Sequence, residues 1–162
     1  MTGAGASQTS TLQHLLDEEA AALRAFLDLL EREQDVLIRG DAERLLPLAA
    51  EKNACFSQLA GLSARRNEAL AQLGYSADRP GMEAWLASRR DLAAAHHRWQ
   101  ELLERLARAR DLNRTNGTLI ATRLQHNQQA LQALLCAANQ ASLYGPDGQA
   151  RPSGSGRHLG SV

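Results

Sequence analysis

The feature that most constrains this chain is a regular spacing of apolar residues near its beginning. From residue 16 to residue 37 the spacing alternates between four and three, which keeps one stripe of an α-helix apolar. The row consists of Leu16, Ala20, Leu23, Leu27, Leu30, Gln34 and Leu37. Ser10 and Gln13 have the spacing of a capping box, in which each side chain bonds to the other's backbone. We therefore expect a helix over 10–38 that packs against other helices as in a coiled coil.

Turn residues divide the next part of the chain. Gly40 favours a left-handed helix end, and Asp41 can cap the helix that follows. We expect this second helix over 42–73. Pro47 falls inside that range, where it would lose a hydrogen bond and clash with the preceding turn. Either a short turn covers 42–46 and the helix starts at Pro47, or the helix is kinked there.

The remaining sequence predicts a short helix, a long helix and two polar ends. Gly74 ends the second helix, and a short helix over 82–89 holds Trp85 and Leu86 inward, either ending there or running into the next. The long helix is expected over 91–142, with a length of roughly 75 Å at 1.5 Å per residue and a C-terminal part that projects beyond its neighbours. No segment has the pattern of a strand, so the fold class is an all-α, elongated antiparallel bundle. Its predicted parts are a disordered N-terminus over 1–9, a helical domain over 10–144 and a flexible tail over 145–162.

The apolar row of the long helix is interrupted midway. The row contains Leu92, Trp99, Leu106, Asn113, Ile120, Asn127 and Leu134, and a companion row contains Leu103, Arg110, Gly117, Leu124 and Leu131. Asn113, Asn116 and Gly117 place polar or very small residues where leucines are expected. One interpretation is a device that fixes register, or a close helix crossing. The other is a hinge, or a boundary between the core and a partner-binding arm.

Composition excludes several classes of function. Eighteen basic and eighteen acidic residues balance, whereas nucleic-acid binders concentrate positive charge. The N-terminus lacks the apolar core of a signal peptide, and no run of 18 apolar residues predicts a membrane span. Cys55 and Cys136 lack CxxC spacing, so we expect reduced thiols and a cytosolic location.

The residues that catalysis or metal binding would require are also missing from the sequence. There is no phosphate-binding glycine loop and no GxSxG nucleophile motif, and His96 and His97 point about 100° apart on a helix. We therefore expect no enzyme activity, no metal, no cofactor and no small-molecule substrate. A helical metalloenzyme remains an alternative that metal analysis of the purified protein would test.

Both halves of the chain resemble the FlgN-type flagellar export chaperones. In the first half the similarity runs from Leu23 to Gly74 and rests on an acidic patch and ordered leucines. These residues are Glu31, Glu33, Leu37, Asp41, Leu45, Lys52, Leu59, Leu62, Arg65 or Arg66, and Leu70. In the second half the similar segments are LNRTNGTLI over 112–120, NQQAL over 127–131 and LYGPDG over 143–148.

The resemblance implies a helical, cytoplasmic chaperone of the flagellar type III export system. Such proteins hold hook-associated (hook–filament junction) proteins before export, prevent their premature association and deliver them to the export gate. It implies client binding by the C-terminal helical region, here assigned to Leu119, Ile120, Leu124, Leu131, Leu134 and Leu135. It also implies docking at the export gate by the C-terminal region, and Tyr144 is the residue that we assign to it.

The C-terminal leucines favour the same role on physical grounds. If the end of the long helix has nothing to cover it, these side chains form an apolar patch of the kind that marks an interface. Two alternatives remain open at this stage. The leucines could pack on the first helix within the chain, or the seam with Asn113 and Asn127 could make the protein a self-associating coiled-coil scaffold, which light scattering would detect.

Overall fold

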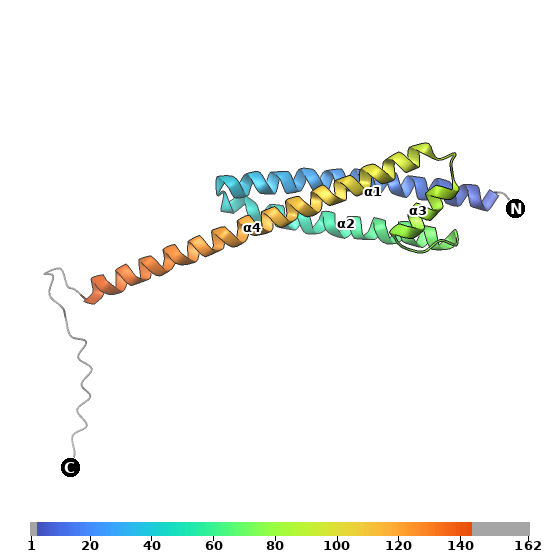
Figure 1. Cartoon of the computed structure of the whole chain (residues 1–162). Helices are drawn as coiled ribbons and strands as arrows, with labels where there is room; N and C mark the ends of the chain where they lie inside the picture. The colour runs from blue at the N-terminus through green and yellow to red at the C-terminus, as the bar shows by residue number, and fades with distance from the viewer. Residues whose placement is uncertain (1–2, 144–162) are drawn as a thin grey trace, which may run out of the picture. The chain divides into compact units, whose positions relative to one another are not determined.

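The computed structural model describes residues 3–143, and every regular element in that range is helical (Figure 1). The elements are α1 (Gly3–Arg39), a short 3-10 turn η1 (Ala42–Arg44), α2 (Leu45–Gln72), α3 (Arg79–Ser88) and α4 (Ala93–Leu143). The chain divides into two units, Met1–Leu119 and Ile120–Val162. In the first unit, α1, α2, α3 and the beginning of α4 share one hydrophobic core. The predicted all-α fold is confirmed.

Helix α1 supplies most of that core. Six of the seven residues in its predicted row are buried, and Gln34 is half-buried. Residues on both sides of the row are buried as well, namely Leu12, Leu15, Ala22, Phe26 and Leu29. The apolar face of α1 is therefore wide enough to pack against two helices, where a strict two-stranded coiled coil needs only a narrow seam.

The start of α1 differs from the prediction. The helix begins at Gly3, whereas we expected disorder over 1–9 and a helix from Ser10. Thr9 lies seven residues before Leu16, so it extends the buried row by one heptad and is itself buried. Its hydroxyl accepts a hydrogen bond from Arg89 at 3.1 Å. The helix therefore starts before Ser10, and at Thr9 burial and the hydrogen bond from Arg89 compensate for a polar side chain.

The turn between α1 and α2 depends on one glycine. Gly40 has φ +78°, a conformation that side chains with a Cβ rarely adopt, and its N–H donates to the Val36 carbonyl at 3.0 Å. Asp41 does not cap the next helix, because its carboxylate pairs with Arg44 at 3.0 Å. Pro47 is the third residue of α2. In that first turn a backbone N–H has no helical acceptor, so Pro47 is accommodated without the loss of a hydrogen bond.

Helix α3 closes the opposite end of the α1–α2 pair. Gly74 (φ +83°) ends α2, and the Asp78 side chain caps α3 by accepting from the Gly81 N–H at 2.9 Å. A Cβ on Gly81 would lie 1.8 Å from the Ser76 carbonyl oxygen, so only glycine fits there. Three apolar side chains of α3 are buried, namely Met82, Trp85 and Leu86. The helix ends at Ser88 and does not continue into α4.

The buried face of α4 is shifted by one residue from part of the prediction. Its buried residues are Ala95, Trp99, Leu102, Ala109 and Asn116. The predicted companion row of Leu103, Arg110 and Gly117 is wrong, because Leu103 is only half-buried and the other two are exposed. Leu102 and Leu103 look equivalent in the sequence, and the small alanines that continue the true row give little signal.

This register predicts unequal effects of two neighbouring leucines. Leu102 is fully buried, so Leu102→Ala leaves a cavity and lowers the free energy of unfolding by about 2–5 kcal/mol. Leu103→Ala makes the same chemical change at a half-buried position and costs less. Urea unfolding of the two variants measures the difference, and an equal or reversed order would contradict the register.

Candidate protein-binding surfaces

The distal part of α4 carries an exposed apolar stripe. Every described side chain from Ile120 to Gln140 is exposed. Five of the six residues predicted to bind a client have exposed fractions of 43–68%. We call these five the distal stripe: Ile120, Leu124, Leu131, Leu134 and Leu135. The sixth, Leu119, is half-buried and belongs to the first unit.

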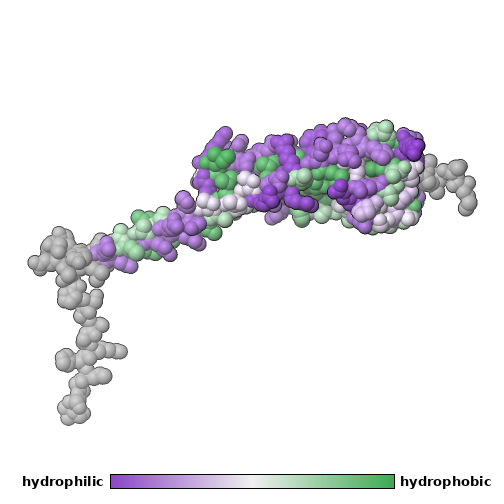
Figure 2. Space-filling view, in the orientation of Figure 1, coloured by the Kyte–Doolittle hydropathy of each residue, from purple (hydrophilic) through white to green (hydrophobic). Residues whose placement is uncertain are grey.

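The distal stripe lies on one side of its helix. At about 100° per residue, its members fall within roughly 100° of the circumference. Figure 2 shows apolar (green) surface alternating with polar (purple) surface along this helix. From residue 120 to 143 the sequence has no aspartate or glutamate, and its charged side chain is Arg123. The arrangement is that of an amphipathic helix offering an apolar face with a neutral-to-basic surround. Tyr144, assigned to export-gate docking, lies outside the described residues.

The three residues predicted as a hinge or register device lie in different surroundings. Asn116 is fully buried, whereas Asn113 and Gly117 are exposed. A Cβ on Gly117 would meet nothing within 4 Å, so the close helix crossing considered for this glycine is wrong. The boundary between the two units follows Leu119, directly after this segment.

Asn116 takes part in a buried polar cluster that joins three helices. Its side-chain amide donates to the Leu30 carbonyl and to a Glu33 carboxylate oxygen, both at 2.9 Å. The other Glu33 oxygen accepts from the Lys52 amine at 2.7 Å. We call Glu33 of α1, Lys52 of α2 and Asn116 of α4 the polar junction. Glu33 and Asn116 are buried and Lys52 is 24% exposed, and the hydrogen bonds between them fix how far each helix is displaced along its neighbours.

A second buried carboxylate lies two heptads earlier on α1. Glu19 accepts from Arg66 of α2 at 2.6 Å, and the Arg66 guanidinium lies 5.1 Å from the centre of the Trp99 ring. Burial raises the pKa of Glu19 above its ordinary value, while Arg66 acts in the opposite direction through its charge and its hydrogen bond. At the surface, α4 also pairs with α1 through Arg98 with Asp17 and Arg108 with Glu31.

Sequence reasoning missed both buried carboxylates as structural groups. A usable signal was present, because Glu19 and Glu33 continue a row of seven-residue spacing with Leu12 and Phe26. A charged residue in such a row is normally assigned to solvent. Only the three-dimensional positions of Arg66 and Lys52 show that these carboxylates are paired inside the bundle.

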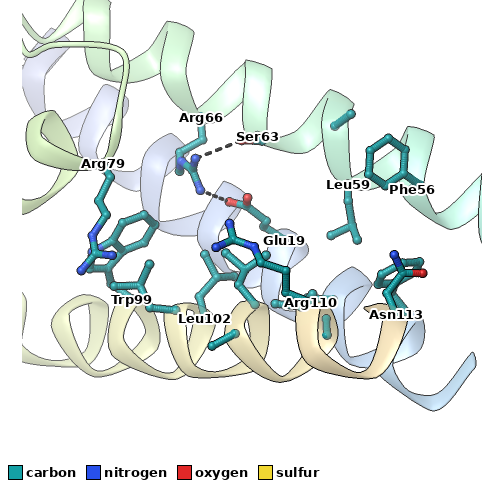
Figure 3. A pocket seen from close by; sticks show the side chains of 17 residues that line it. Glu19, Phe56, Leu59, Ser63, Arg66, Arg79, Trp99, Leu102, Arg110 and Asn113 are labelled. Carbon is teal, nitrogen blue, oxygen red and sulfur yellow. Dashed lines mark hydrogen bonds and ion pairs between the residues drawn. The ribbon is translucent and has the colours of Figure 1, made fainter. Parts of the chain in front are cut away.

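A groove of about 610 Å³ opens between α2 and α4, with α1 as its floor (Figure 3). We call it the α2–α4 groove. Its apolar lining includes Leu23, Phe26, Phe56, Leu59, Leu102 and Leu106. Its polar lining includes Glu19, Ser63, Arg66, Arg79, Arg110 and Asn113. All of these residues belong to the first unit.

Two classes of site have no counterpart in the described range. Among residues 3–143, no three histidine, cysteine, aspartate or glutamate side chains are grouped so that they could hold a metal ion. No helix in the same range is long and apolar enough to cross a membrane.

Comparison with known proteins gives one consistent result. The family described as FlgN protein matches residues 1–152. The flagella synthesis protein FlgN of Salmonella typhimurium is 30% identical over 147 residues, which cover 90% of this chain and 94% of that protein. FlgN of Escherichia coli is 28% identical over 138 residues, which cover 85% of this chain and 88% of that protein. FlgN of Yersinia enterocolitica is 30% identical over 154 residues, which cover 92% of this chain and 96% of that protein. No solved structure matches.

The polar junction predicts that two neighbouring asparagines respond differently to the same change. Asn116→Asp replaces a donor with a buried carboxylate beside Glu33, which should lower the free energy of unfolding by about 3 kcal/mol or more. Asn113→Asp makes the same change at an exposed position and should alter the free energy of unfolding by no more than about 0.5 kcal/mol. Thermal unfolding at neutral pH compares them. A mild effect at both positions would mean that Asn116 does not hold α4 in place.

The raised pKa of Glu19 predicts a pH dependence of known sign. A carboxyl with a higher pKa when folded than when unfolded contributes stability below its unfolded pKa, which is about 4.5, and loses that contribution as the pH rises through the folded value. Glu19→Gln removes this titration. The stability of the unaltered chain relative to Glu19→Gln should therefore be greatest at low pH and decline toward neutrality. Urea unfolding across the pH range measures it, and the opposite slope would show that pairing with Arg66 outweighs burial.

Proposed function

Because the chain belongs to the FlgN family of flagella synthesis proteins, we propose that it is a cytoplasmic chaperone of the flagellar type III export system. In this role it binds hook-associated proteins, prevents their premature association and delivers them to the export gate. The function requires recognition by helix surfaces, with no catalytic step and no cofactor.

The observation that carries the proposal is the distal stripe. Large apolar side chains exposed along one face of a helix usually mark an interface, since fully burying each one contributes about 1.5–3 kcal/mol. A helix with such a face binds a second helix, or a segment that folds on binding, by packing the two apolar faces together. A client whose own apolar segment is covered in this way cannot use it to associate with other subunits.

The remaining assignments follow the same division of the chain. We assign to Asn116 the role of register residue, because its hydrogen bonds to α1 require one position of α4. Gly117, near the end of the first unit, is the point at which we place the change from bundle to client-binding helix. Docking at the export gate is assigned to Tyr144 on the basis of the family resemblance alone.

The direct test replaces two members of the distal stripe. Ile120→Asp combined with Leu131→Asp places two carboxylates on the apolar face and should abolish binding to C-terminal fragments of hook-associated proteins, measured by calorimetry. The midpoint of thermal unfolding should shift little, because both side chains are exposed.

A matched control uses the opposite side of the same helix. Gln125→Asp with Gln129→Asp adds the same charge about 140–180° away from Ile120 and should leave client binding intact. If the unaltered, folded chain binds none of the fragments, the chaperone proposal is wrong. If the Ile120 and Leu131 double variant unfolds, these residues belong to the core instead.

A further inference from the structure

The α2–α4 groove is shaped to accept a further helix. Two helices form its walls and a third forms its floor. In a four-helix bundle, three helices surround the fourth in the same way. Two large apolar side chains on its walls remain exposed to solvent, Phe56 at 64% and Leu106 at 38%. An amphipathic helix lying in the groove would cover both, with apolar residues at positions i, i+3, i+4 and i+7.

The charges of the groove point to an acidic occupant. The carboxylate that lines the groove, Glu19, is already paired with Arg66. Arg79 pairs with Glu83 at 2.7 Å, while Arg110 of α4 pairs with no carboxylate in the described part of the chain. Figure 3 shows Arg66 on the α2 wall and Arg110 on the α4 wall. The groove therefore has an uncompensated positive charge beside an apolar surface.

The two C-terminal segments of the chain do not offer a suitable occupant. The helical segment from 120 to 143 has an apolar face but no acidic residue, and its charged residue, Arg123, has the same sign as Arg110. The segment from 145 to 162 has one acidic residue, Asp147, and its large aliphatic residues are Leu159 and Val162. Neither segment, from this chain or from a second copy, combines an apolar stripe with carboxylates.

We propose that the α2–α4 groove is a second protein-binding site, which takes an amphipathic helix of another protein whose apolar stripe is flanked by aspartate or glutamate. Phe56, Leu59 and Leu106 contact the stripe, and Arg110 binds a flanking carboxylate. The site lies in the first unit and does not use the distal stripe, so it goes beyond the proposed client binding and leaves that surface available.

The test uses two synthetic helical peptides and the full chain. One peptide has leucines at i, i+3, i+4 and i+7 flanked by glutamates, and the other has lysines in place of the glutamates. Titrations are followed by the indole N–H signals in NMR, where Trp99 lies in the groove and Trp85 of α3 does not. The acidic peptide should bind and shift the Trp99 signal while leaving Trp85 unchanged, and the lysine peptide should bind at least about tenfold more weakly.

Three variants locate the binding. Arg110→Glu should weaken binding of the acidic peptide about tenfold and strengthen binding of the lysine peptide. Leu106→Ala should weaken the acidic peptide, whereas Leu46→Ala, the same change at an exposed leucine outside the groove, should not. Circular dichroism verifies that each variant is folded.

Several results would overturn the proposal. These are binding of neither peptide to the unaltered chain, equal binding of both, or binding of the acidic peptide that Arg110→Glu and Leu106→Ala leave unchanged. A Trp99 shift that grows with protein concentration alone would assign the groove to a second copy instead. Loss of client binding in the Ile120 and Leu131 double variant tests the distal stripe separately, so the two proposals succeed or fail independently.

Discussion

Glu33 lies inside the bundle, where an ionised carboxylate without partners would be strongly destabilising. The Lys52 amine of α2 and the Asn116 amide of α4 both bind it, so folding brings three helices to one point. The apolar face of α1 supplies the driving force for packing, but leucines slide past one another at little cost. Buried polar groups remove that freedom, since a shift of one turn would separate each from its partners. Glu19 and Arg66 form a second buried pair of this kind, two heptads earlier on α1.

The fold could largely be predicted from the sequence where the apolar pattern is dense. The row of α1, the glycine turns at Gly40 and Gly74 and the inward side of α3 were all recognisable from spacing and turn chemistry. The pattern failed where small or charged residues occupy buried positions. Ala95 and Ala109 contribute little hydrophobic signal, and Glu19 and Glu33 indicate a solvent-exposed position. All four are nevertheless buried. In these places a partner on another helix decides the outcome, and local sequence does not contain it.

The two candidate surfaces also differ in how well the sequence predicts them. The distal stripe lies within one helix, so its spacing can be read directly along the sequence. The α2–α4 groove brings together Phe56, Leu106 and Arg110 from segments far apart in the chain, and no local pattern marks them as neighbours. Asn116 and Asn113 illustrate the limit most clearly. They are the same residue type three positions apart and lie only about 60° apart around the helix, but Asn116 is fully buried and Asn113 is exposed, because the edge of the buried face falls between them.

Lys52 is the only lysine in the sequence, and the other seventeen basic residues are arginines. Its amine is therefore the one side-chain amine in the protein, and it is held in an ion pair with a buried carboxylate at the place where three helices meet. Reagents that acylate amines ordinarily label a protein surface at many points. In this protein, acylation of a lysine side chain requires the contact between Lys52 and Glu33 to open. Because the Lys52 side chain is 24% exposed, the rate of this modification reports how often the Lys52–Glu33 contact breaks locally.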